Sequence, residues 1–74
     1  MNEEEMFKKF GENVRKQREK ENLTLNDVAK KTKIREQYLQ KIENGKATGI
    51  RCSHIIIIAH ALNIEAYKLC KGLQ

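Results

Sequence analysis

Apolar residues recur every three or four positions along most of this chain, and that spacing places them on one face of an α-helix. The pattern predicts five helices, over residues 6–21, 25–32, 35–44, 52–62 and 66–71. Residues 1–5 are polar and acidic and are expected to form a flexible N-terminus. Because no linker rich in proline or glycine divides the rest, residues 6–74 are expected to form a single domain. The predicted fold class is all-α, a compact five-helix bundle.

Residues 24–44 have the pattern of two short helices joined by a tight turn, which is a helix-turn-helix. Thr24 and Asp27 have the spacing of a capping box, in which each side chain satisfies a free backbone N–H at the start of a helix. Asn44 and Gly45 mark the end of the second helix, because glycine adopts the left-handed conformation without steric cost.

The second helix of this motif has two distinct faces. Leu39 and Ile42 are expected to face inward. The outward face carries only side chains that can form hydrogen bonds, namely Glu36, Gln37, Gln40, Lys41 and Asn44. Any solvated surface helix has a similar composition, so this face alone does not indicate a function.

The formal net charge of +5 is distributed unevenly along the chain. Residues 1–14 carry four glutamates against two lysines, whereas residues 28–51 carry seven Lys or Arg residues against two glutamates. The basic excess therefore coincides with the helix-turn-helix and the loop after it. A polyanion is the expected partner of such a surface, although a membrane surface or an acidic protein would also match its charge.

Length and hydropathy exclude several classes of protein. A chain of 74 residues buries only roughly 60% of its unfolded surface, so a large enzyme cleft is not expected. No nucleophile, base and orienting group converge in the predicted fold. The longest apolar run, residues 55–59, is much shorter than the roughly 20 residues of a membrane-spanning helix, and no secretory signal pattern opens the chain. A soluble, cytoplasmic protein that is not an enzyme and has no membrane partner is expected.

Residues 52–62 are the ambiguous segment, because the four successive isoleucines at 55–58 have strong β propensity. A helix is favoured, since the chain offers no second strand to pair with and apolar residues recur at helical spacing. The inward positions expected for this helix are Cys52, Ile55, Ile56, Ala59 and Leu62. Ile57 falls outside that stripe and, with Ala61, leaves an apolar spot on the surface. We expect a homodimer that uses this spot as its interface.

The cysteines and histidines do not predict a metal site. Cys52 and Cys70 are too few and too far apart for a disulfide framework, and both fall on apolar faces, so they are expected in the core. On one helix, Cys52 and His60 would lie about 12 Å apart, and His54 and His60 would point to different faces. No metal and no cofactor are therefore expected.

Several short motifs occur in a characteristic order along the chain. They are GENVRKQR at 11–18, LT at 23–24, VA at 28–29, Ile34, YL at 38–39, KIENGK at 41–46 and IAHAL at 58–62. Together they resemble the phage-repressor/Cro type of DNA-binding helix-turn-helix domain, the XRE family. The likeness covers residues 10–72, and its most specific parts are the KIENGK motif and the position of Arg18 upstream of it.

The resemblance implies a sequence-specific DNA-binding transcription regulator that acts as a repressor and binds double-stranded DNA. It implies that the helix over 35–44 lies in the major groove with its base-reading residues Arg35, Glu36, Gln37, Gln40 and Lys41. Phosphate contacts are implied for Thr24, Asn26, Tyr38, Asn44, Lys46 and Arg51. The resemblance also implies that Arg18 and Glu43 meet as a partly buried, bidentate ion pair. It leaves a further, unidentified protein partner open.

Two positions depart from the family pattern. Leu25 stands where the family usually has a glutamine that contacts phosphate, and Lys33 stands in the turn where the family usually has glycine. If that turn needs a left-handed residue, Lys33 costs roughly 1 kcal/mol. A second resemblance is to the helix-turn-helix domains of bacterial cell-shape proteins, which bind a cytoskeletal filament protein; it rests on Leu25, residues 27–29, residues 32–35 and residues 38–39. A protein-interaction module is therefore the alternative function.

Overall fold

In the computed structural model, which describes residues 1–73, the chain forms five helices. They are α1 (Glu3–Lys20), α2 (Leu25–Thr32), α3 (Glu36–Glu43), α4 (Cys52–Ala61) and α5 (Ala66–Leu69). The described residues contain no strand, so the isoleucine-rich segment is helical and the all-α fold is confirmed. Gln74, the last residue of the predicted domain, lies outside the described residues.

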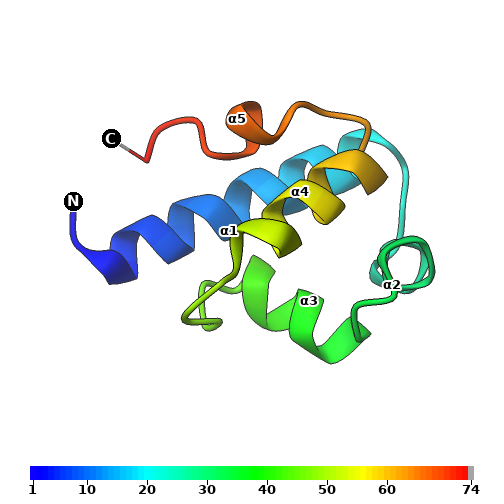
Figure 1. The fold of residues 1–74 in the computed structure, drawn as a ribbon, viewed down its shortest axis with the longest axis horizontal. Helices are drawn as coiled ribbons and strands as arrows, with labels where there is room; N and C mark the ends of the chain where they lie inside the picture. The colour runs from blue at the N-terminus through cyan, green and yellow to red at the C-terminus, as the bar shows by residue number, and fades with distance from the viewer. Residues whose placement is uncertain (74) are drawn as a thin grey trace.

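Helix α1 runs through the middle of the molecule, with α5 on one side of it and α3 on the other (Figure 1). Helix α2 packs against α3, and α4 packs against both α2 and α5. This arrangement leaves α3 at the edge of the molecule farthest from α5 in Figure 1. One side of α3 is therefore available for contact with another molecule.

Helix α1 begins three residues before the predicted start at Met6. The side chain of Asn2 accepts a hydrogen bond of 2.8 Å from the backbone N–H of Glu5 and caps the helix. The next three residues are glutamates, whose charges are favourable beside the positive end of a helix dipole. A capping asparagine before three glutamates is a helix start signal, which places the start of α1 before the predicted Met6. Flexibility of residues 1–5 stays a prediction.

All five helices contribute to one hydrophobic core. Its buried side chains are Phe10, Val14, Val28, Leu39, Ile42, Ala47, Ile58, Ala59, Leu62 and Leu69. The predicted inward positions of α3, Leu39 and Ile42, are both almost fully buried. Because α3 makes these contacts from one side only, the rest of its surface stays in solvent.

The predicted inward face of α4 is confirmed at Ile55, Ala59 and Leu62 and is wrong at Cys52 and Ile56. Ile58 is fully buried, whereas Ile56 is 55% exposed and Cys52 is exposed. The observed inward stripe is 55, 58, 59 and 62, which has the i, i+3, i+4, i+7 spacing of a helix face. Four successive isoleucines carry no phase information, so the sequence could not fix this rotation. Cys52 stays in solvent because it lies in the first turn.

Cys70 differs from Cys52 in its surroundings. Its side chain is partly buried and packs against the core, close to its predicted place. Burial raises the pKa of the Cys70 thiol, with a smaller contribution from Cys52. A raised pKa keeps this thiol protonated and unreactive at neutral pH.

Helices α1 and α3 approach each other closely at Gly11. A Cβ atom added to this glycine would overlap the backbone carbonyl oxygens of Ile42 and Glu43. Backbone atoms cannot move aside as the end of a flexible side chain can, so glycine is required for this approach. The close contact places the end of α3 directly against the middle of α1.

A buried ion pair joins the same two helices. Nε of Arg18 donates to Oε2 of Glu43 at 2.6 Å, and Nη2 of Arg18 donates to Oε1 at 3.1 Å. A third nitrogen, Nη1, donates to the backbone carbonyl of Leu23 at 2.8 Å. The side chain of Glu43 is only 2% exposed, and this bidentate pair raises the pKa of Arg18. The chain thus contains the ion pair that the family resemblance implied.

Replacing Arg18 with methionine should strongly destabilise the fold. The substitution keeps an unbranched apolar stem but leaves the Glu43 carboxylate buried without its main partner, which costs about 3–5 kcal/mol. Arg15→Met is the matched control, because Arg15 is 53% exposed and lies 3.5 Å from the same carboxylate. An exposed ion pair contributes about 0–1 kcal/mol. Urea denaturation followed by circular dichroism measures the free energy of unfolding of both variants. Equal stability of the two variants would contradict this assignment.

Candidate nucleic-acid interface

The predicted capping box at the start of α2 is present. The Thr24 hydroxyl accepts a hydrogen bond of 3.0 Å from the backbone N–H of Asp27, and the Thr24 backbone N–H donates to the Asp27 carboxylate at 2.9 Å. The backbone hydrogen bond from Thr24 is the main reason why the pKa of Asp27 is lowered, so the box is intact at neutral pH. The Thr24 hydroxyl proton remains free to donate to a phosphate.

The turn between α2 and α3 has the left-handed residue that the sequence suggested. Lys33 has φ 65° and closes α2 by donating its N–H to the carbonyl of Ala29 at 2.8 Å. Thr32 shapes the turn with its hydroxyl, which donates to the carbonyl of Val28 and accepts from the N–H of Ile34. A lysine therefore occupies a conformation that favours glycine, and its exposed side chain adds a positive charge beside α3.

The outward face of α3 contains the predicted base-reading residues. All five are exposed, namely Arg35, Glu36, Gln37, Gln40 and Lys41. Arg35 is the N-cap residue, and its side chain makes no capping hydrogen bond. The other four lie at positions i, i+1, i+4 and i+5, which share one side of a helix. This side is opposite the buried Leu39 and Ile42.

A groove of about 490 Å³ runs along one side of α3. It is lined by Lys33, Ile34, Arg35, Gln37, Tyr38, Lys41 and His54. The groove thus brings together four of the predicted site residues, and Glu36 and Gln40 lie outside it. No carboxylate lines it, so three cationic side chains act on it without a neutralising partner in its walls.

Tyr38 of α3 and His54 of α4 both line this groove. Their rings meet edge to face, with centroids 5.6 Å apart and planes at 64°. The Nδ1 atom of His54 is buried and has no hydrogen-bond partner in the protein. His54 and Lys33 also line the groove, although neither was among the predicted site residues. A sequence signal for His54 is absent, because it reaches Tyr38 only through the packing of α4.

The remaining predicted phosphate contacts lie around α3 in exposed positions. Thr24 and Asn26 belong to the start of α2, and Asn44 is the C-cap residue of α3. Lys46 lies in the loop before α4, and Arg51 is the N-cap residue of α4. None of these five residues lines the groove. Tyr38, the sixth predicted phosphate contact, is half-buried and does line it.

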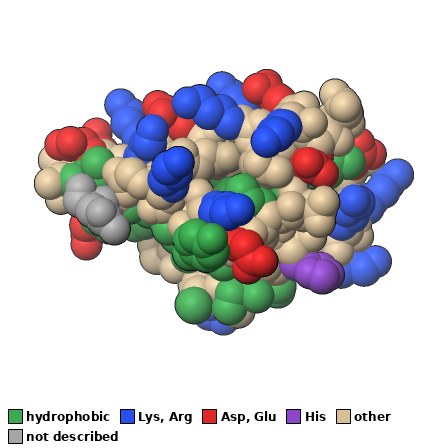
Figure 2. All heavy atoms as spheres, turned by 90° about the horizontal axis from the view of Figure 1, so that it is seen from above, with side chains coloured by type: hydrophobic (Ala, Val, Ile, Leu, Met, Phe, Trp, Pro, Cys, Tyr) green, Lys and Arg blue, Asp and Glu red, His purple; other side chains and the backbone are tan. Residues whose placement is uncertain are grey.

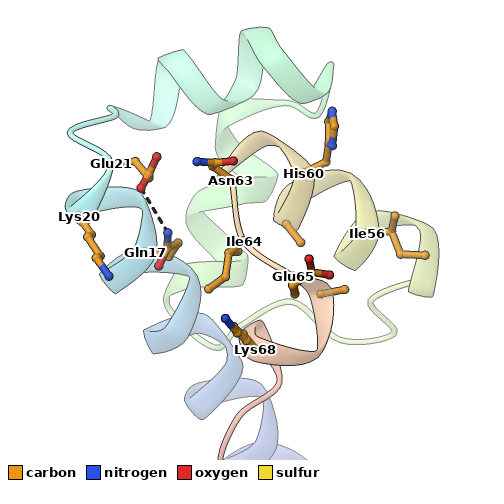
Figure 3. A pocket seen from close by; sticks show the side chains of 11 residues that line it. Gln17, Lys20, Glu21, Ile56, His60, Asn63, Ile64, Glu65 and Lys68 are labelled. Carbon is orange, nitrogen blue, oxygen red and sulfur yellow. Dashed lines mark hydrogen bonds between the residues drawn. The ribbon is translucent and has the colours of Figure 1, made fainter.

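A second hollow lies between α1, α4 and α5 (Figure 3). Its charged side chains are mixed, because Lys20 and Lys68 lie beside Glu21 and Glu65. His60 points away from both carboxylates in this view. Among residues 1–73, no group of three or more His, Cys, Asp or Glu side chains could hold a metal ion. No described helix has the length and hydropathy of a membrane span.

Comparison with known proteins agrees with this arrangement. A family model described as a helix-turn-helix domain matches residues 11–74. A solved structure, the restriction-modification controller protein C.AhdI from Aeromonas hydrophila, is 27% identical with a TM-score of 0.81, covering 85% of this chain and 94% of that chain. No curated protein sequence matches the chain. The family match spans most of the chain and includes both helices of the motif. The protein therefore belongs to the helix-turn-helix domain family, in its XRE type, and is a DNA-binding regulator.

Proposed function

We propose that this protein is a repressor that recognises a specific DNA sequence by placing α3 in the major groove. The observation that carries the proposal is the outward face of α3, where every side chain can form hydrogen bonds and none is used by the fold. A helix fits the width of the major groove, and base edges there present distinct donors and acceptors. The groove beside α3 adds positive charge where the DNA backbone would run.

The chemistry of the face matches base recognition. Gln37 can donate to and accept from adenine at once, and Lys41 can donate to the O6 and N7 acceptors of guanine. The two are four residues apart and both line the groove, so they share one stripe of the helix. Glu36 can accept a hydrogen bond from the amino group of cytosine. These residues are the proposed base readers.

Phosphate contacts would fix the position of α3 on the duplex. Exposed donors stand at the start of α2, at the end of α3 and at the N-cap of α4. The two helix N-termini add backbone N–H groups and a favourable dipole for phosphate. Such contacts position a protein without reading sequence, while the base contacts supply specificity.

Repression requires only that a bound protein occupies a promoter and excludes other proteins from it. The solved relative is named as a controller protein, and this chain covers 94% of it. Regulation by a chain of this size is therefore consistent with the comparison. We propose repression over activation because occupation alone is sufficient for it.

We also propose that the protein pairs as a homodimer through α4. Ile57 is 42% exposed, and its neighbour Ile56 is more exposed still. Figure 2 shows hydrophobic side chains gathered at the lower edge of that view. A two-fold dimer would read two half-sites about one helical turn apart, which raises affinity beyond that of one short helix.

Gln37→Ala and Arg51→Ala should separate base reading from phosphate contact. Gln37→Ala is expected to weaken binding to the preferred duplex by about 1–3 kcal/mol and to leave binding to a scrambled duplex nearly unchanged. Arg51→Ala is expected to weaken binding to both duplexes and to reduce the log–log salt slope by roughly one unit. Titration of both duplexes at several salt concentrations measures these effects.

Glu36→Gln probes the negative charge on the same face. It should strengthen binding to the scrambled duplex, because the carboxylate repels phosphate, even if a cytosine contact is lost. One contradicting result is a wild type that prefers no duplex, and another is that Gln37→Ala and Arg51→Ala leave the affinity for both duplexes unchanged. Either result would show that α3 does not dock in the major groove of DNA. A protein-interaction module would then be the better function.

Lys33→Gly should make the fold more stable and DNA binding weaker. Glycine removes the cost of a left-handed lysine, about 1 kcal/mol, and part of that gain is offset by the greater entropy of the unfolded chain. Loss of the charge should reduce the salt slope by up to roughly one unit. Lys33→Ala is the control, since it removes the charge but keeps the strain. If both variants unfold at the same urea concentration, the turn is not strained.

Ile57→Lys should weaken dimerisation and leave the monomer folded. A lysine placed in an apolar interface must lose its hydration without gaining a partner. Met6→Lys is the control, because Met6 is an exposed apolar residue on α1. Sedimentation of the three proteins at equal concentration measures the association. An unchanged sedimentation coefficient for Ile57→Lys would remove this residue from the interface.

A further inference from the structure

Helix α1 carries a lysine stripe on the side turned away from α3. At about 100° per residue, Lys9, Lys16 and Lys20 lie within about 40° of one another around the helix axis. The same geometry places them about 180° from Gly11 and Arg18, the residues through which α1 contacts α3. The stripe is therefore on the opposite side of the molecule from the DNA-reading face.

Two further lysines from the C-terminal region face this stripe. Lys68 and Lys71 line, with Lys9, Lys16 and Lys20, a groove of about 380 Å³ between α1 and α5. We call these five residues the lysine groove. No carboxylate is among its lining residues. Figure 2 views the molecule from the side on which α5 lies, and blue Lys and Arg side chains are spread over this face.

The lysine groove differs from its neighbour between α1, α4 and α5 (Figure 3). That hollow shares Lys20 and Lys68 but also contains Glu21 and Glu65, so its charges balance. On α1, Glu12 and Glu19 lie about 60–80° to one side of the lysine stripe, and Glu5 lies about 40° to the same side, one turn before Lys9. An anion in the lysine groove would therefore meet five cations at close range and carboxylates only at its edge.

The two walls of the lysine groove are held together by Asn13. Its side-chain nitrogen donates to the backbone carbonyl of Leu69 at 2.8 Å and to that of Lys71 at 2.9 Å. The chain at Gly72 also runs close to the side chain of Lys9, where an added Cβ would lie 2.9 Å from Lys9 Cε. These contacts fix the end of α5 against α1, so the lysines of the two elements keep a defined spacing.

We infer that the lysine groove binds the phosphate backbone of a second DNA duplex, so that the protein bridges two DNA segments. Lysines are compact point charges that suit phosphate, and contacts with phosphate carry no sequence information. From Lys9 to Lys20 the stripe is about 16 Å long, and a duplex presents one charge per about 1.7 Å of its axis. The stripe can therefore face several phosphates at once.

Other polyanions fit this groove less well. Single-stranded nucleic acid is usually held by aromatic side chains that stack on its bases, and no aromatic residue lines the groove. A protein partner is usually anchored by buried aromatic residues or arginines, and the lining contains neither. A duplex needs only the phosphate contacts that the five lysines offer.

A capture experiment tests the second duplex. The preferred duplex is fixed to beads, the protein is added, and a fluorescent duplex of unrelated sequence is supplied in solution. The wild type should retain the fluorescent duplex in a salt-sensitive manner. Lys16→Gln/Lys20→Gln should bind the fixed duplex as before and retain roughly tenfold less of the second one. The inference rests on the proposed function only in one respect, namely that α3 binds the fixed duplex.

Lys30→Gln/Lys31→Gln is the matched control, because it removes the same charge from exposed positions at the end of α2. It should retain the second duplex as the wild type does. The bridging inference would be overturned if the wild type binds the fixed duplex but retains no second duplex. It would also be overturned if Lys16→Gln/Lys20→Gln retains the second duplex as the wild type does. Both results would leave the proposed function intact. Loss of fixed-duplex binding in Lys16→Gln/Lys20→Gln would mean that the lysine groove holds the first duplex, which would contradict both the α3 interface and the bridging inference. No binding of any duplex would overturn both.

Discussion

The ion pair between Arg18 and Glu43 is the interaction on which the presentation of α3 depends. Helix α3 has only eight residues, and a helix of that length is not stable by itself in water. Its position must come from packing on its inner side, where Leu39, Ile42 and Glu43 are buried. The bidentate contact with Arg18 and the close approach at Gly11 fix the end of α3 against α1.

This anchoring separates the stability of α3 from the residues proposed to recognise DNA. Because the inner side supplies the contacts with the core, the outer side can carry charged and polar side chains without weakening the fold. The same division holds for α1, whose side facing α3 contains Gly11 and Arg18, while its far side carries the lysine stripe. A small all-α domain thus offers two separate surfaces for polyanions, the polar outer face of α3 and the lysine groove.

The sequence predicted what depends on local patterns. The helix-turn-helix, the capping box of Thr24 and Asp27, and the inward positions of Leu39 and Ile42 all follow from spacing within one or two helix turns. For α4, the inward positions Ile55, Ala59 and Leu62 are confirmed. Ile56 is exposed and Ile58 is buried instead, because an unbroken run of isoleucines has no polar face. The predicted start of α1 at Met6 is wrong because Asn2 caps the helix three residues earlier than the apolar pattern begins.

Features that depend on long-range packing could not be predicted. His54 joins the groove beside α3 only because α4 packs near Tyr38, sixteen positions earlier in the chain. The lysine groove combines α1 with residues near position 70, which the hydrogen bonds of Asn13 bring together. Periodicity within one segment carries no information about which segments become neighbours. The family resemblance supplied the Arg18–Glu43 contact, which spacing alone would not have given.

Selection of bound fragments from a random pool of DNA duplexes is the most direct test of sequence recognition by α3. The account predicts that repeated rounds enrich a short motif, present as two inverted half-sites with centres about one helical turn apart. Fragments without the motif should bind more weakly by a margin that persists as salt is raised, because base contacts add to the electrostatic attraction. A pool that stays random after selection, despite salt-sensitive binding, would contradict base reading by α3.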